Sequence, residues 1–273
     1  MGDLHIGSSS TDEQQLREDL TECLELDARI ILNGDIYDAI LAKDHRRFML
    51  SCLKKNLSSR DDLLNALIQY GVKFLEPYAE QIDVIGMGNH EYAVLKYHSV
   101  DLIRMTIDGL NESLRVSGSK HRIKHGGYCG FVQYVCTIKK CHEKSSGGTR
   151  NYTVLYHHGG GSESPVTKGM IDISRKRVNW VYDLFVFGHK HNLFGVKDVT
   201  MSLNSNGNLV CVDNLSVQTG SYLKNYHQQT QEDAHVMGYS EVFQMAPKPM
   251  GTPLVKWRFR GEDGKRLEQR ALI

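Results

Sequence analysis

The feature that most constrains this chain is a short apolar run that ends in a glycine and a carboxylate. Residues 30–32 are β-branched or apolar and are followed directly by Asn33, Gly34 and Asp35. The run predicts a buried parallel strand, and Gly34 lets the chain leave the sheet without a steric cost. Asp35 then lies just beyond the carboxyl end of the strand, where open α/β sheets bind their ligands. A carboxylate there can accept hydrogen bonds, take up a proton or bridge two metal ions.

Four further segments place polar side chains after an apolar run or on an extended stretch. These pairs are Asp3 with His5, Asn89 with His90, His157 with His158, and His189 with His191. Residues two apart on an extended segment point to the same side, so the first and last pairs can each reach one ion. Each motif alone also fits a turn or a surface loop. Together they offer oxygen and nitrogen ligands without cysteine, which suits Mn, Fe or Zn in a site that is not purely structural.

The remainder of the chain predicts alternating helices and strands. Helices are expected at 11–28, 44–57, 60–80, 92–114 and 166–182, and strands at 29–32, 83–87, 128–138, 152–156 and 183–187. Thr11 and Gln14 resemble a capping box for the first helix. From residue 194 the pattern changes to an antiparallel hairpin around Asn204–Gly207, with further strand-like pieces at 239–243 and 254–259. We therefore expect an α/β fold in a single domain over residues 1–273.

The composition argues against several classes of protein. A formal net charge of +1 gives no electrostatic case for a dedicated nucleic-acid or membrane-surface binder. No window approaches the roughly 18 apolar residues of a membrane span, and the first residues lack the basic and apolar regions of a signal peptide. The six cysteines are scattered and are interpreted as buried free thiols, so a cytoplasmic protein is expected. A zinc site at Cys136, Cys141 and His142 is not favoured, because the spacing contains no CxxC pair.

In chain order the motifs read D-x-H, GD-x-x-D, GNHE, HGG and GH-x-H, from Asp3 to His191. This series resembles the calcineurin-like metallophosphoesterase superfamily. The resemblance implies a four-layer α/β/β/α sandwich, in which two mixed β-sheets are flanked by helices and the metals lie at strand ends. The segment Thr219–Lys224 and the glycines after His158 look most like virus- or phage-encoded members, which would place the protein in the host cytoplasm.

The resemblance also implies a dinuclear centre, with Mn as the expected metal and Fe or Zn as alternatives. The first ion would be held by Asp3, His5 and His191, the second by Asn89, His158 and His189, and Asp35 would bridge them.

We assign His158 rather than His157 because a histidine directly before Gly-Gly matches several branches of the superfamily, although other branches favour the first histidine. His90 would be the catalytic residue that meets the substrate phosphate, and Asp38 would orient a ligand from outside the metal shell.

The implied activity is hydrolysis of a phosphomonoester or phosphodiester. Two ions lower the pKa of bound water, and a hydroxide between them serves as the nucleophile. His90 can stabilise the transition state or protonate the leaving oxygen. One alternative is a metal-dependent DNA nuclease of the same superfamily. The near-neutral net charge argues mildly against it, while the basic groups at 46–55 and 115–124 keep it open. Another is a non-catalytic scaffold, but such members lack ligands that this chain retains.

Two positions depart from the family pattern. In the family the D-x-H motif follows a buried strand, whereas only Met1 and Gly2 precede Asp3 here. Either the central strand is missing or the natural start lies upstream, and a missing strand would loosen Asp3 and His5. Position 38 is Asp rather than the Tyr of purple acid phosphatases, so a metal–tyrosinate centre is not expected.

Overall fold

The computed structural model describes residues 1–39, 53–138, 148–161, 164, 166–224, 226, 246–260 and 266–273. Within these ranges the chain is an α/β fold, as the sequence predicted. The helices are α1 (Glu13–Glu25), α2 (Lys55–Ser58), α3 (Leu63–Leu75), α4 (Asn89–His98), α5 (Leu102–Val116) and α6 (Met170–Arg177), with a 3-10 turn at Glu76–Tyr78. The strands are β1 (Ile30–Leu32), β2 (Ile82–Gly86), β3 (Lys124–Gly127), β4 (Cys129–Ile138), β5 (Gly148–His157), β6 (Leu184–Phe187), β7 (Phe194–Leu203), β8 (Leu209–Gln218), β9 (Leu254–Arg260) and β10 (Arg266–Leu272).

The strands form three sheets in the described part of the chain. β1, β2 and β3 pair in parallel, β4-β5-β6-β8-β7 form a five-stranded mixed sheet, and β9 pairs with β10 in an antiparallel hairpin. The sequence predicted two mixed sheets, but only the five-stranded one among these is mixed. The β9–β10 hairpin attaches through aromatic packing, since Trp257 stacks on Tyr152 of β5 with ring centroids 4.3 Å apart.

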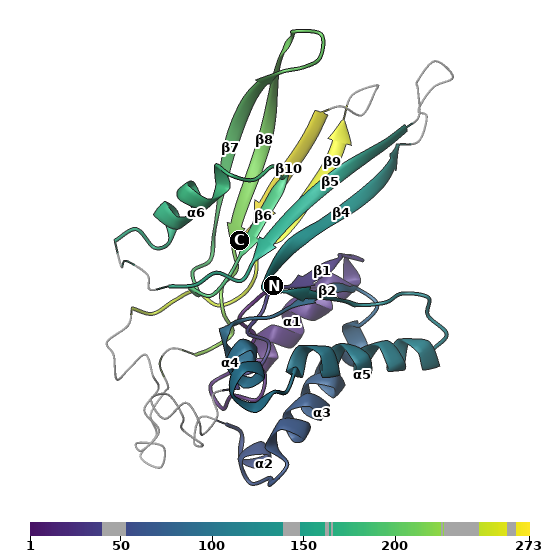
Figure 1. Ribbon diagram of the computed structural model, residues 1–273, viewed down its shortest axis with the longest axis vertical. Helices are drawn as coiled ribbons and strands as arrows, with labels where there is room; N and C mark the ends of the chain where they lie inside the picture. The colour runs from purple at the N-terminus through teal and green to yellow at the C-terminus, as the bar shows by residue number, and fades with distance from the viewer. Residues whose placement is uncertain are drawn as a thin grey trace.

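Side chains of β1 alternate between two hydrophobic clusters. Ile30 and Leu32 pack with the apolar residues of α1, α3 and α5, whereas Ile31 packs with the strands of the five-stranded sheet and of the β9–β10 hairpin. This alternation follows from the two-residue period of a strand. Figure 1 shows the result, with α1, α3, α4 and α5 gathered around β1 and β2 at one end and the long strands extending away from them.

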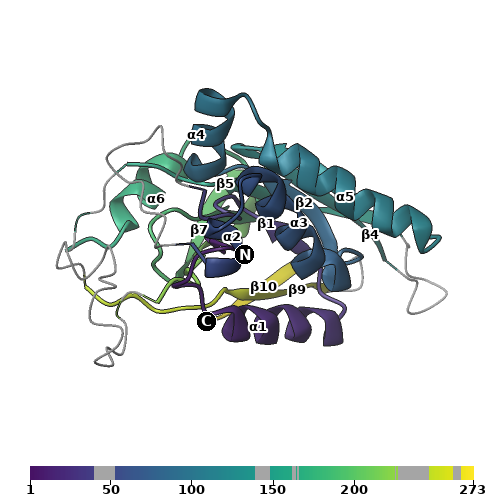
Figure 2. The same cartoon turned by 90° about the horizontal axis from the view of Figure 1, so that it is seen from below.

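The five-stranded sheet also has two apolar faces. In β6, Leu184 and Val186 face the cluster shared with β1, while Phe185 and Phe187 face the opposite side. There they pack with Ile173 of α6. Figure 2 shows α6 lying apart from α1, α3 and α5. The strand ends that carry the polar motifs therefore lie where the parallel sheet and the five-stranded sheet meet.

Three predicted helices differ from the structure, and the one expected at 166–182 is limited to α6, Met170–Arg177. α1 is capped by the side chain of Asp12, which accepts from the amide of Gln15, because the hydroxyl of Thr11 donates instead to the carbonyl of His5. The helix expected at 92–114 is divided into α4 and α5. Ser99 is left-handed with φ 57° and ends α4, and Asp101 then caps α5.

The segment before β1 is held to it by backbone hydrogen bonds, although no regular strand precedes Asp3. The amide of Asn33 donates to the carbonyl of Met1 at 2.7 Å, and the amide of Asp3 donates to the carbonyl of Gly34 at 3.0 Å. His5 continues this pattern with a 3.0 Å bond to the carbonyl of Asp35. These contacts place Asp3 and His5 directly beside Asp35.

Several predictions fall on residues outside the described ranges. They are most of the helix at 44–57 with its basic residues, the strand-like piece at 239–243, and Cys141 with His142. Of the cysteines described, Cys23 is buried as expected. Cys136 is half-buried, and Cys129 and Cys211 are exposed, so the expectation of buried thiols was wrong for these last two. None of the described helices has both the length and the apolar character needed to cross a membrane.

Candidate metal centre

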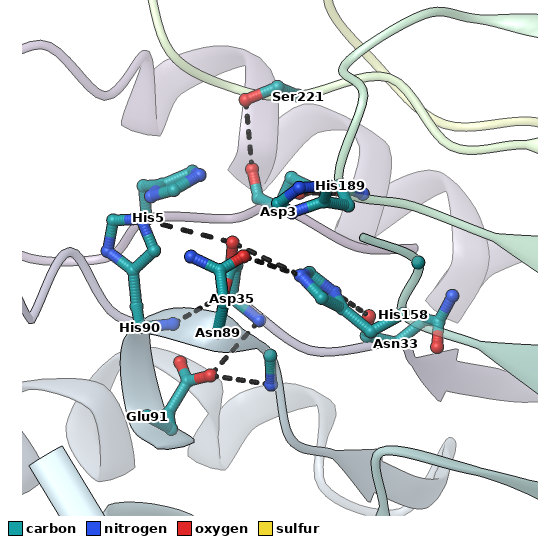
Figure 3. Close-up of polar contacts among 12 residues, drawn as sticks. Asp3, His5, Asn33, Asp35, Asn89, His90, Glu91, His158, His189 and Ser221 are labelled. Atoms are coloured by element: carbon teal, nitrogen blue, oxygen red, sulfur yellow. Dashed lines mark hydrogen bonds and ion pairs between the residues drawn. The ribbon is translucent and has the colours of Figure 1, made fainter. Parts of the chain in front are cut away.

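The residues predicted from the motifs lie together where several strands end, and Figure 3 shows most of them converging on Asp35. They come from five segments: Asp3 and His5 from the N-terminal segment, Asp35 and Asp38 from the turn after β1, Asn89 and His90 from the start of α4, His158 from the end of β5, and His189 and His191 from the turn after β6. Parallel strands deliver their carboxyl ends to one edge, so residues far apart in sequence meet there.

Asp3, His5 and His191 form the first group that could hold a metal ion. One ligand atom from each lies within 4.8 Å of the others, and Asp3 Oδ1 is 3.3 Å from His191 Nε2. His5 is only 2% exposed, yet neither of its ring nitrogens has a hydrogen-bond partner among the described residues. Burial and the neighbouring His90 lower the pKa of His5 to about 4, so its imidazole is neutral with a lone pair to offer. A metal ion would satisfy a buried nitrogen that the protein leaves unpaired.

Asp35, His158 and His189 form a second such group, also within 4.8 Å. His158 Nε2 lies 3.2 Å from Asp35 Oδ2 and 3.2 Å from Asn89 Oδ1. His158 Nδ1 lies 2.8 Å from the carbonyl oxygen of Asn33, so the protonated Nδ1 donates to it and Nε2 is turned toward the carboxylate. Metal-binding histidines commonly carry such a hydrogen bond on the nitrogen away from the ion.

His157 points away from this group. Its Nδ1 accepts a 2.8 Å hydrogen bond from the amide of Gly159, which follows the strand end. Neighbouring residues of an extended strand face opposite sides, so only one of His157 and His158 can meet Asp35. In the structure that residue is His158, which is completely buried.

Asp38 and His90 lie beside the first group and, with His5, form a third candidate cluster. Asp38 Oδ1 is 3.3 Å from His90 Nδ1 and 3.9 Å from His5 Nδ1, while His90 Nε2 is 4.0 Å from Asp35 Oδ2. Burial opposes a charge on His90, but the carboxylates of Asp35 and Asp38 prevail and raise its pKa to about 9. Asp38 therefore touches the predicted catalytic histidine as well as a predicted ligand.

The backbone of the site is unusual. Eight non-glycine residues among those described have positive φ, and five of them belong to the site: Asp3, His5, Asp35, His189 and His191, with φ of 53°, 49°, 48°, 71° and 55°. Non-glycine residues rarely adopt this region, at a cost of about 1–3 kcal/mol each, and such residues cluster at functional sites. The strain indicates that the surrounding structure holds these side chains in a fixed arrangement.

Gly88 allows the close packing of this cluster. A Cβ at position 88 would lie 2.0 Å from Asp35 Oδ1 and 2.3 Å from the Asp35 amide nitrogen. The glycine of the G-N-H motif is thus required because the turn after β1 and the start of α4 are in direct contact. The amide of His90, in the first turn of α4, donates to Asp35 Oδ1 at 3.0 Å.

The electrostatics of the site favour a cation. Asp3 is completely buried and Asp35 is 2% exposed, and their ion-pair partners in the described structure are histidines rather than lysine or arginine. Although burial opposes it, His191 lowers the pKa of Asp3, and His90 and His158 lower that of Asp35. In turn Asp35 raises the pKa of the buried His158 to about 10. Buried carboxylates are costly without a counter-charge, which a divalent ion would supply.

Glu91 was not singled out from the sequence, yet it organises the turn that carries Asp35. It is completely buried, and its carboxylate accepts from the amides of Gly88 at 2.8 Å, Asp35 at 3.2 Å and Tyr37 at 2.8 Å. Burial and the neighbouring Asp35 raise its pKa to about 7. Its position three residues after Gly88, at the start of α4, is the signal that could have identified it, because acidic residues there cap helix amides.

The donor set fits divalent ions that prefer oxygen and nitrogen ligands. It consists of carboxylates, imidazoles and the amide oxygen of Asn89, with no cysteine within the three groups. Comparison with models of known protein families finds none that matches this chain, and a search of curated proteins finds no significant match. The functional interpretation therefore depends on the chemistry of the site.

Proposed function

We propose that this protein is a phosphoester hydrolase that depends on two divalent metal ions. One observation carries the proposal: two groups of one carboxylate and two histidines lie side by side at the strand ends. They are Asp3 with His5 and His191, and Asp35 with His158 and His189. Asn89 Oδ1, 3.2 Å from His158 Nε2, adds an oxygen ligand to the second group.

The fold supports this proposal. One cluster of apolar side chains lies between the parallel sheet and the five-stranded sheet, α1, α3 and α5 pack on the outer side of the first, and α6 packs on the outer side of the second. This arrangement is compatible with the four-layer sandwich of calcineurin-like metallophosphoesterases. We propose that the chain adopts that architecture, with β9–β10 as an added hairpin.

Charge explains why a phosphate would bind. Asp3 and Asp35 carry two negative charges against four positive charges on two divalent ions, with Mn as the preferred metal, so the loaded site attracts an anion. When bound, the ions would lower the pKa of water and hold the attacking and leaving oxygens of the phosphoester.

The protein residues around the ions orient groups and transfer protons. His90 would donate a hydrogen bond to a phosphate oxygen and pass its proton to the leaving oxygen, since its ring lies 4.0 Å from Asp35 Oδ2 at the edge of the centre. Asp38, 3.3 Å from His90 Nδ1, would hold that ring in place. The carbonyl of Asn33 would keep His158 in the tautomer that presents Nε2.

Two cations of the basic segments that kept the nuclease alternative open are paired with carboxylates of the protein itself. Lys54 pairs with Glu13 at 2.7 Å, and Arg115 pairs with Glu112 at 2.6 Å. These cations are already neutralised by neighbours on the protein. Small phosphoesters are therefore the proposed substrates, and single- and double-stranded DNA belong in the same assay as comparisons.

The test is hydrolysis after controlled loading with metal. The protein is stripped with a chelator, reloaded separately with Mn²⁺, Fe²⁺ or Zn²⁺, and assayed with p-nitrophenyl phosphate and bis-p-nitrophenyl phosphate. We expect turnover of at least one substrate with Mn²⁺ and none in the chelated protein. Absence of turnover for both substrates with every metal would contradict the proposal.

Metal binding should also stabilise the folded protein, and His5 provides the test. A ligand present at 100 times its dissociation constant stabilises the native state by about 2.7 kcal/mol. We expect Mn²⁺ to raise the melting temperature of the wild type, and His5→Gln to lose most of this increase because a buried ligand is removed. His98→Gln, which lies outside the three groups, is the matched control. Equal increases in wild type and His5→Gln would exclude His5 as a ligand.

A further inference from the structure

Tyr128 lies against the metal centre but belongs to none of its candidate ligand groups. It occupies the single position between β3 and β4, and its carbonyl accepts a 3.0 Å hydrogen bond from the amide of His158. Its ring meets the ring of His158 at a centroid distance of 5.4 Å and that of His157 at 5.8 Å. Both contacts are edge-to-face, with interplanar angles of 85° and 86°. The backbone and the two imidazoles thus fix the tyrosine beside a predicted ligand.

The ring of Tyr128 is only partly buried, and glycines without side chains precede Tyr128 and follow His158. Gly127 precedes the tyrosine, and Gly160 lies two residues beyond His158. A Cβ at either glycine would meet no described atom within 4 Å apart from those of the flanking residues, so the space next to both is open. In contrast, a Cβ at Gly88, inside the centre, would collide with Asp35. Open space beside a fixed aromatic ring is suited to a planar group of a ligand.

The position of Tyr128 relative to Asp35 determines which part of a ligand it can reach. His158 lies between them: its Nε2 is 3.2 Å from Asp35 Oδ2, and its ring contacts Tyr128. A phosphate bound at Asp35 and His90 would therefore be separated from Tyr128 by the His158 ring, and an ester substituent that extends past this ring would meet Tyr128. Base–aromatic stacking contributes about 1–3 kcal/mol per ring and tolerates many kinds of ring.

We propose that Tyr128 is a specificity-determining residue that stacks on a planar aromatic group of the substrate, so that aryl or nucleoside phosphoesters are preferred to alkyl phosphoesters. This inference rests on the proposed phosphoester hydrolase function. The competing view is that Tyr128 only packs against His158 and keeps that ring in place. The two views differ in whether the effect of removing the Tyr128 ring on substrate binding depends on which substrate is used.

The kinetic test compares Tyr128→Ala and Tyr128→Phe with the wild-type Mn-loaded protein. The substrate pairs are phenyl phosphate with glycerol phosphate, and AMP with ribose 5-phosphate, which separate an aryl from a nucleobase preference. We expect Tyr128→Ala to raise KM for the aromatic member of at least one pair by about 5- to 100-fold while leaving the alkyl member within about 2-fold. Tyr128→Phe, which keeps the ring, should retain the preference. Equal losses on both members, or no aromatic preference in the wild type, would overturn the inference.

A binding measurement separates this inference from the hydrolase proposal. Phenylphosphonate and propylphosphonate cannot be hydrolysed at the phosphorus–carbon bond, so calorimetry with the Mn-loaded protein needs no turnover. We expect wild type and Tyr128→Phe to bind the phenyl compound at least about 5-fold more tightly than the propyl compound, and Tyr128→Ala to bind both alike. If no substrate is hydrolysed but this pattern holds, the proposed function fails and the aromatic site stands. If hydrolysis occurs and both compounds bind alike in all three proteins, the aromatic site fails alone.

Discussion

Replacing Asp35 with asparagine is expected to lower phosphoester hydrolysis at least about 100-fold and to reduce the bound metal measured by elemental analysis. Changes to groups that merely support metal ligands cost about 10- to 100-fold, so loss of a shared ligand should cost no less. Asp35 Oδ2 lies 3.2 Å from His158 Nε2 and 4.0 Å from His90 Nε2, so it touches a ligand of the second group and faces the predicted catalytic histidine. Asparagine keeps the size of the side chain but removes the negative charge that would attract both ions.

The asparagine variant should fold, which makes its activity interpretable. Asp35 has φ 48°, and asparagine tolerates this left-handed conformation better than most residues. Its side-chain oxygen can still accept from the amide of His90. Asp108→Asn, an exposed carboxylate on α5, is the control and should retain full activity and metal content. Unchanged hydrolysis in Asp35→Asn would show that the Asp35 carboxylate is not needed for the reaction, whatever the metal content.

The sequence predicted the location of this site because strand ends are readable locally. An apolar run that stops at glycine and a polar residue marks the carboxyl end of a strand, as at Gly34 and Gly188, and parallel strands bring such ends together. The choice between His157 and His158 was different. Because side chains alternate along a strand, the two histidines must face opposite sides of the sheet. Which of them faces Asp35 depends on how β5 pairs with β4 and β6, and the pattern of a single sequence does not specify that pairing.

Some parts of the fold escaped prediction, either because a local signal was missing or because they depend on contacts distant in sequence. The helical sequence pattern continues through Ser99, where the structure has a left-handed residue that ends α4. Such a helix end is usually marked by glycine, and serine at this position gives no such signal. β9 confirms the strand-like piece predicted at 254–259, but its attachment to the larger sheet was not predicted, because Trp257 packs on Tyr152, more than a hundred positions away in the chain. The role of Glu91 likewise requires the turn after β1 to lie against α4, which only the folded chain provides.

Removing the Glu91 carboxylate is expected to give the largest loss of stability among these variants. Glu91→Ala leaves the amides of Gly88, Asp35 and Tyr37 without their acceptor in a buried environment, at about 1–3 kcal/mol for a single unsatisfied group. Since such costs are not additive, we expect the free energy of unfolding to fall by about 3–5 kcal/mol in urea titrations of the metal-free protein. That loss is a large fraction of the stability of an ordinary domain.

Glu91→Gln separates two contributions of this side chain to stability: the hydrogen bonds that its carboxylate accepts and the volume that it fills. The amide oxygen can replace Oε2 as acceptor for Gly88 and Asp35, but the NH₂ group would face the N–H of Tyr37, so a loss of about 1–3 kcal/mol is expected. Glu25→Gln, an exposed carboxylate at the end of α1, should change stability by less than about 0.5 kcal/mol. If Glu91→Gln were as stable as the wild type, its three amide contacts would not hold the turn after β1. Asp35 would then owe its position to the neighbouring histidines and to Gly88 alone, and Mn²⁺ affinity should be the same in Glu91→Gln and wild type.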